Sequence, residues 1–214
     1  MIDVHTHIIP NVDDGARDIE TSLLMIKKEI ECGVDTIVFT PHSYLHRFID
    51  KDMIINKFNL LKGELVNYDI KYYLGQEIYY ETDTLEKLKN NKYLTINNTK
   101  YILIEFDYDI TYDDLVDIIY SIRLLGYEPI IAHIERYNIS IKDYYRLKKE
   151  FNPLLQVNCE FVLKHKIKAL IMIKDKVIDY IASDCHSTNR RKPNLDKVKK
   201  ILKRYSFLNI DRFN

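Results

Sequence analysis

The sequence is poor in the residues that interrupt or cross-link a chain. It has only five glycines, five prolines and three cysteines among 214 residues. So few glycines and prolines predict few long loops. Cys32, Cys159 and Cys185 are odd in number and lie far apart in the sequence. They therefore provide no evident disulfide framework, and we expect a reduced, cytoplasmic protein.

Long apolar runs and net charge are missing as well. No apolar stretch approaches the ~18–20 residues of a membrane span, so no integral membrane segment is expected. The first residues lack the basic and apolar regions of a secretory signal, which also favours the cytoplasm. The 32 basic and 32 acidic residues cancel. This balance argues against a general nucleic-acid binder, because such proteins are usually basic.

The sequence does contain a repeated alternation of strand and helix patterns. Helical patterns lie between most of the strand-like runs, and no repeat, linker or low-complexity tract is found. The alternation predicts parallel strands in an α/β protein, either a barrel or a doubly wound sheet, formed by one domain over residues 1–214. The strand-like runs are 2–7, 36–40, 71–77, 101–106, 129–133, 154–158 and 177–183, and the clearest helical patterns are 18–32, 113–125, 142–150 and 195–205.

Six of these seven strand-like runs end in an imidazole or a carboxylate. The C-terminal ends of parallel strands meet at one edge, where active sites form in α/β proteins. Imidazole and carboxylate together suit Zn, Fe or Mn, and eight such groups exceed the needs of one ion, so we expect two or three ions. Gly75 is expected to leave room for this crowded centre. The eight groups are His5, His7, His42, Glu77, Glu105, His133, Asp184 and His186; the run 154–158 ends in Asn158 and breaks the pattern.

The opening "MIDVHTH" shows why a bound cation is expected. Strand alternation places Asp3, His5 and His7 on one face of an otherwise apolar strand. Three polar groups there are costly unless they are paired or bind something. The two remaining histidines, His46 and His165, lie in a loop and a helix-like stretch and are expected at the surface.

Several motifs together resemble a known family. "MIDVHTHIIPNVDDGARD", "TPH", "GQE", "LIEF", "AHIER" and "SDCH" resemble the PHP metallohydrolases. More narrowly, they resemble the manganese-dependent protein-tyrosine phosphatases of capsule and exopolysaccharide synthesis in Gram-positive bacteria. The resemblance runs from residue 1 to about residue 193 and departs at Ile134, where the family usually has proline. It implies a distorted seven-stranded (β/α) barrel, the PHP fold, with three metals at its rim.

The resemblance also implies roles for individual residues. The eight groups above would be metal ligands, as would Asp14, although residues 13–15 also fit a simple turn. Manganese is the implied ion, and the same ligands accept Fe, Zn, Co or Mg. Arg136 and Arg191, less so Arg190, are assigned to the phosphate because guanidinium groups match its geometry; a solvated basic turn is the alternative for residues 190–191. Asp14 or a metal-linked histidine would act as general acid.

The implied reaction is hydrolysis of phosphotyrosine by a metal-activated water, on the tail of a membrane-associated tyrosine kinase. Cys185 and Arg191 also fit the C-x5-R spacing of cysteine-dependent phosphatases, but "CHSTNRR" contains no glycine to wrap a phosphate.

Two other functions stay open: a small-metabolite phosphomonoesterase, similar to histidinol phosphatase, and a non-catalytic, metal-dependent scaffold that binds the kinase. The scaffold would dock through a basic helix that also fits a plain solvated face, with Lys197, Lys199, Lys200, Lys203 and Arg204.

Overall fold

The computed structural model describes residues 1–214, in which strands and helices alternate along most of the chain. The strands are β1 (Ile2–Thr6), β2 (Thr36–Phe39), β3 (Lys71–Leu74), β4 (Glu77–Tyr79), β5 (Tyr101–Glu105), β6 (Glu128–Ile131), β7 (Leu154–Asn158) and β8 (Tyr180–Ala182). The α-helices are α1 (Ile19–Glu31), α2 (Lys51–Glu64), α3 (Thr84–Lys89), α4 (Tyr112–Leu124), α5 (Ile141–Glu150), α6 (Cys159–Lys164), α7 (Lys166–Lys174) and α8 (Lys199–Arg204). Short 3-10 helices are η1 (Leu65–Asn67), η2 (Ile96–Asn98), η3 (Ile134–Arg136) and η4 (Leu195–Lys197).

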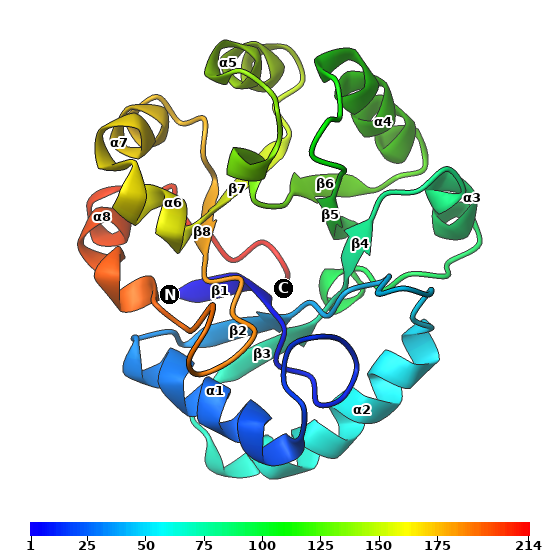
Figure 1. Ribbon diagram of the computed structural model, residues 1–214, viewed down its shortest axis with the longest axis vertical. Coiled ribbons are helices and arrows are strands. Elements are labelled where there is room, and N and C mark those ends of the chain that lie inside the picture. The colour runs from blue at the N-terminus through cyan, green and yellow to red at the C-terminus, as the bar shows by residue number, and fades with distance from the viewer.

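The strands form two parallel sheets, in the orders β1-β2-β3 and β4-β5-β6-β7-β8. Figure 1 shows the strands arranged around a centre with the helices outside. The expected parallel α/β architecture is confirmed, but a closed barrel of seven strands is not, because there are eight strands in two sheets. The expected strand 71–77 divides at Gly75 and Gln76: β3 pairs with β2, whereas β4 pairs with β5.

The first and last strands lie next to each other. The backbone N–H of Asp184 donates to the carbonyl of His5 (3.0 Å), and that of His7 donates to the carbonyl of Cys185 (2.9 Å). Because β1 is the first strand and these partners follow the last, the two ends of the chain bring their polar residues to the same edge.

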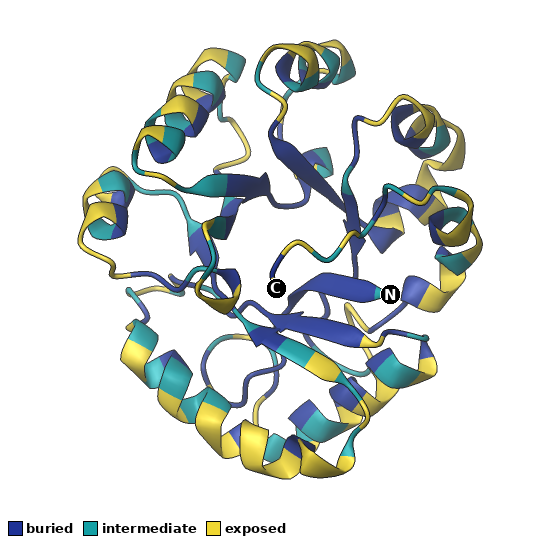
Figure 2. Ribbon diagram, turned by 180° about the vertical axis from the view of Figure 1, so that it is seen from behind, coloured by how far each residue is buried: buried dark blue, intermediate teal, exposed yellow.

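Apolar side chains form two cores. A cluster of 44 buried residues lies between the strands and the surrounding helices, and Figure 2 shows strands that are mostly buried and helices with exposed outer faces. A second cluster of 12 residues fills the interior between the strands. Phe213 is fully buried there and packs edge-on against Tyr73 and Tyr101, with ring centroids 6.0 and 5.5 Å apart. The C-terminal residues thus close one end of the interior.

Local sequence signals explain the helices that were expected. Asp18 begins α1 by accepting the N–H of Thr21 (2.7 Å), and Gly33, with φ +82°, ends it. The predictions for 18–32, 113–125 and 142–150 are confirmed, while 195–205 divides into η4 and α8. Helices α2, α3, α6 and α7 were not specified by the sequence patterns. None of the helices combines the length and apolar character that crossing a bilayer would require.

Candidate metal centre

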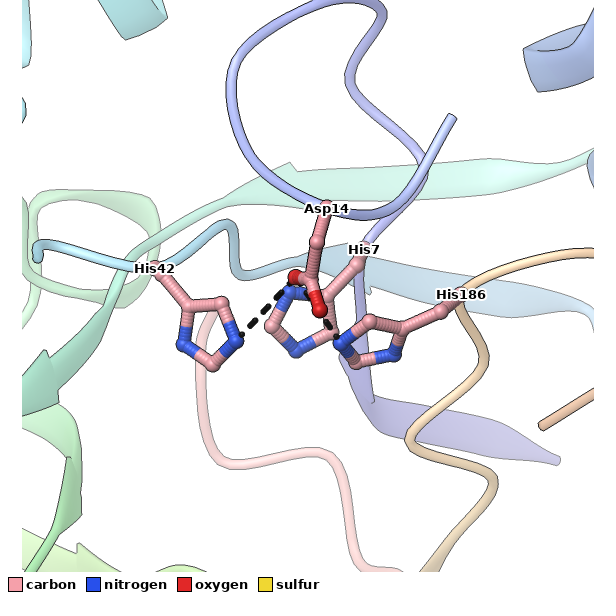
Figure 3. Close-up of side chains that lie close together, drawn as sticks. All are labelled: His7, Asp14, His42 and His186. Carbon is pink, nitrogen blue, oxygen red and sulfur yellow. Dashed lines mark ion pairs between the residues drawn. The ribbon is translucent and has the colours of Figure 1, made fainter. Parts of the chain in front are cut away.

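All the predicted metal ligands lie at one edge of the strands. Within each of four overlapping groups, one nitrogen or oxygen atom per residue lies within 4.8 Å of the others. Figure 3 shows the first group, in which Asp14 lies between His42 and His186 with His7 beside them. The groups are His7, Asp14, His42 and His186; His5, His7 and Asp184; His5, Glu77 and His133; and His42, Glu77 and Glu105. The structure therefore brings together all nine predicted ligands.

Glu77 is at the middle of this cluster. Its Oε1 lies 3.1 Å from His5 Nε2 and 3.0 Å from His133 Nε2. Its Oε2 lies 2.8 Å from His42 Nδ1 and 3.2 Å from His7 Nε2. The sequence places Glu77 here because Gly75 and Gln76 carry the chain from β3 into β4 at this edge. One buried carboxylate therefore faces four imidazoles.

The donor atoms fit a cation better than they fit one another. His5 Nε2 and His7 Nε2 lie only 3.1 Å apart, so two ring nitrogens face each other with room for a single proton between them. Glu77 Oε2, His133 Nδ1 and His186 Nε2 are buried and make no hydrogen bond of good geometry. Buried polar atoms of this kind are costly unless something binds them. Because all the donors are nitrogen or oxygen, the centre suits Zn, Fe, Mn or Mg and not an ion that requires sulfur.

Neighbouring carboxylates favour the charged form of two imidazoles, His7 and His133. Burial lowers the pKa of His7, but Asp13 and Glu77 outweigh it and raise that pKa to about 10. Burial likewise lowers the pKa of His133, while Glu105 and Glu77 raise it to about 9. Burial raises the pKa of Asp184, yet its neighbours hold it well below its usual range. A cation that binds here must therefore displace protons from imidazoles.

Asp14 is held over the centre by a loop that closes on His7. The N–H of Ala16 donates to the carbonyl of His7 (3.0 Å), and a Cβ at Gly15 would lie only 2.0 Å from that same oxygen. Only glycine allows this approach. Asp14 Oδ1 lies 3.4 Å from His186 Nε2 and 3.5 Å from His42 Nε2. The adjacent imidazole of His186 lowers the pKa of Asp14, so its carboxylate is ionised.

Two arginines also reach this edge. The guanidinium groups of Arg136 and Arg191 both pair with the carboxylate of Asp184, Arg191 Nη2 lying 2.5 Å from Oδ1. The backbone N–H of His186 donates to the carbonyl of Arg191 (2.8 Å), which fixes the loop after β8. Arg190 makes no ion pair and is exposed. Of the two neighbouring arginines, Arg191 is therefore the one that belongs to the site.

Sequence reasoning missed three residues that hold the ligands. Asp13 Oδ2 lies 2.7 Å from His7 Nδ1. Gln156 Oε1 lies 3.2 Å from His5 Nδ1 and accepts the N–H of His133 (2.8 Å), and Asn158 donates to Asp184 (2.8 Å). Groups that orient metal ligands in this way tune affinity. The available signal was Gln156 and Asn158 at alternate positions of an otherwise apolar strand.

Two expectations about buried residues were wrong. Asp3 does not share the face of His5 and His7: it accepts the backbone N–H of Ser183 at 3.1 Å. The pairing of β1 with β2 shifts register between Asp3 and Thr6, which interrupts the strict alternation. Gly75 does not make room for the centre, since a Cβ there would meet Ile96 at 3.0 Å.

The remaining histidines and the cysteine lie apart from the centre. His46 and His165 are exposed, as predicted. Cys185 is fully buried, and its Sγ points to Glu29 Oε1 at 3.3 Å. Burial raises the pKa of the Cys185 thiol well above its usual range, so the reactive thiolate is disfavoured.

Comparison with known proteins agrees with this geometry. The family model described as "Capsular polysaccharide synthesis, CpsB/CapC" matches residues 1–209. A tyrosine-protein phosphatase CpsB of Streptococcus agalactiae is 34% identical, over 94% of this chain and 89% of that protein. Tyrosine-protein phosphatase YwqE of Bacillus subtilis is 31% identical, over 89% of this chain and 79% of that protein. A structure from crystallographic work on YwqE and Streptococcus pneumoniae CpsB, described as unique metal-dependent tyrosine phosphatases, superposes with a TM-score of 0.82 at 28% identity, covering 96% of this chain and 87% of that one. The chain belongs to the CpsB/CapC family of capsular polysaccharide synthesis.

Proposed function

We propose that this chain is a metal-dependent protein-tyrosine phosphatase of capsule or exopolysaccharide synthesis. The observation that carries this proposal is the convergence of nine imidazole and carboxylate groups with two arginines at one edge of the strands. The phosphatase names of relatives that share 34% and 31% identity support the reaction. The metal dependence stated for the structurally similar phosphatases supports the cofactor.

The nine residues of the four groups are the proposed ligands of two or three cations. Manganese is the proposed ion, and Fe, Zn, Co or Mg would accept the same nitrogen and oxygen donors. When bound, such ions would supply Lewis-acid chemistry, which lowers the pKa of water and neutralises negative charge on phosphate oxygens. The ionised carboxylate of Asp14 suits a ligand better than a proton donor. The tyrosine oxygen is a leaving group of pKa ~10, so a proton donor would assist its departure.

Arg136 and Arg191 are the proposed phosphate-binding residues. Their side chains are about two-fifths exposed, at 40% and 38%, so they can meet a ligand from solvent while their guanidinium groups reach Asp184. Paired N–H donors in a plane match two phosphate oxygens, which a lysine ammonium cannot do. In phosphoryl transfer, positioning and charge neutralisation account for most of the catalysis. No side-chain nucleophile is required, in agreement with the burial of Cys185.

We further propose that residues 1–214 form a single cytoplasmic domain in which the two sheets act as one distorted barrel. The large core cluster draws on both sheets, and backbone hydrogen bonds join β1 to the loop after β8. The proposed substrate is the phosphotyrosine-containing tail of a membrane-associated tyrosine kinase. The balance of 32 basic and 32 acidic residues supports a protein substrate over nucleic acid.

The test compares a phosphotyrosine peptide with histidinol phosphate, before and after chelation and after manganese is restored. We expect turnover of the peptide that chelation abolishes and manganese recovers. Arg191→Lys should lower kcat/KM by roughly 100-fold, because it removes paired donors to the phosphate. Arg190→Lys, one position away and outside the site, is the matched control. Preference for histidinol phosphate would identify a metabolite phosphatase, and peptide binding without turnover would identify a scaffold.

A further inference from the structure

A cavity of about 420 Å³ opens beside the proposed metal centre, between η3, α6 and α7. We name it the α6–α7 cleft. Its inner end is formed by Arg136, Asp184 and Arg191. These are the two proposed phosphate-binding arginines and the carboxylate that both of them contact. A substrate whose phosphate lies against these arginines therefore has the cleft directly beside it.

The outer part of the cleft is basic. Lys164, His165 and Lys168 line it and are all exposed. Lys168 makes no ion pair within the chain; its Nζ lies 5.6 Å from the ring centroid of Phe161. Lys164 has only an exposed pair with Glu160 at 3.0 Å, a kind of contact that contributes little and is readily exchanged.

The carboxyl groups of the cleft do not cancel this charge. The cleft has four lysine or arginine side chains and one histidine against three acidic side chains. Asp184 is already enclosed by two guanidinium groups and is a proposed ligand. Glu135 accepts the backbone N–H of Asn158 at 3.1 Å and faces the interior. The lysines thus keep unused capacity for an anion from solution.

A second cavity on a different sector of the same edge has the opposite character. It has a volume of about 480 Å³ and lies at α4 and the ends of β4 and β5 (Figure 1). Its charged residues are Asp107, Asp109, Asp114 and Asp117, and it contains no basic residue. An anionic segment of substrate is repelled there and attracted to the α6–α7 cleft. The edge around the centre therefore has a basic cleft at α6 and α7 and an acidic cavity at α4.

We propose that the α6–α7 cleft binds a second anionic side chain of the substrate, a carboxylate or a phosphate close to the phosphotyrosine, and so selects acidic phosphotyrosine peptides. The proposal rests on the phosphatase function proposed above. The cleft adjoins the arginines, and an extended peptide advances about 3.3 Å per residue, so the second anion is expected near the phosphotyrosine in the peptide sequence. Lysine suits this role because its mobile ammonium binds an anion as a point charge, without demanding one geometry.

The test measures kcat/KM for three peptides that carry one phosphotyrosine each. One has neutral neighbours, one has glutamates within three positions, and one has phosphoserines at those positions. We expect the anionic peptides to be turned over roughly tenfold better, and the arm with the larger effect identifies carboxylate or phosphate as the preferred anion. The double variant Lys164→Gln/Lys168→Gln should remove that preference and leave the neutral peptide unchanged. Lys166→Gln/Lys174→Gln, on α7 but not among the residues that line the cleft, is the matched control.

The Kd of each peptide for the chelated protein separates this proposal from the proposed function. If the anionic peptides bind more tightly and this difference disappears in Lys164→Gln/Lys168→Gln, the cleft proposal is supported. That result holds even if no peptide is hydrolysed, and the absence of hydrolysis would then contradict only the phosphatase function. Equal Kd and equal kcat/KM for neutral and anionic peptides would overturn the cleft proposal while hydrolysis stands. A preference that survives in the cleft variant, or is lost in the control, would also overturn it.

Discussion

Gly15 is neither a proposed metal ligand nor a proposed substrate-binding residue. We nevertheless expect its replacement by alanine to lower the catalytic activity strongly. The new Cβ would lie 2.0 Å from the carbonyl oxygen of His7 and 2.6 Å from its Cβ. Atoms in contact normally settle about 3.5–4.0 Å apart, so the loop or His7 must move by more than about 1 Å. Such a displacement in a catalytic centre lowers rates by about 100-fold. We therefore expect Gly15→Ala to reduce kcat/KM for a phosphotyrosine peptide by about that factor.

The same variant should fold, since crowding a packed site costs about 1–3 kcal/mol. Urea unfolding measures this cost, and elemental analysis measures the bound metal, which should fall because Asp14 and His7 separate. Gly63→Ala is the matched control: it lies in α2 with no atom within 4 Å of its new Cβ. Alanine should stabilise that helix by about 0.5–1 kcal/mol and leave turnover unchanged. A folded Gly15→Ala protein with normal metal content and turnover would refute the reasoning.

Three further predictions test other parts of the structure. Cys185→Ser should keep turnover close to that of the unmodified protein, because the thiol is buried and points to Glu29; loss of turnover with metal still bound would restore a cysteine mechanism. Gln156→Met should weaken manganese binding by about 10- to 100-fold in a calorimetric titration, because it removes a partner of His5 and His133; unchanged affinity would deny Gln156 an orienting role. Phe213→Ala should lower the free energy of unfolding in urea by about 3–5 kcal/mol, and a much smaller loss would mean that the interior collapses around the gap.

The ligand set could be predicted from the sequence because its signal is local. Each of His42, Glu105 and His133 follows a short β-rich run, and parallel strands bring such ends to one edge whatever their order. Asp14 was less evident, since the residues around it also fit a turn. What decides its place is the close approach of Gly15 to His7, which depends on packing between two segments.

The parts that could not be predicted depend on partners distant in the chain. The shift in register that turns Asp3 away from His5 is defined only by the pairing of β1 with β2. The break at Gly75 separates β3 from β4 because each pairs with a different neighbour. Helices α6 and α7 contain six and nine residues, too few for a clear periodic pattern. The cleft they line was therefore invisible in the sequence.

The burial of Phe213 bears on how the protein is made. During translation this residue leaves the ribosome after every strand, although it packs among strands from the whole length of the fold. A nascent chain that stops short of it exposes the aromatic rings of Tyr73 and Tyr101, which Phe213 otherwise covers. Chains that stop before Phe213 should thus be substrates for chaperones and proteases, and native resistance to digestion should arise only once Phe213 is packed.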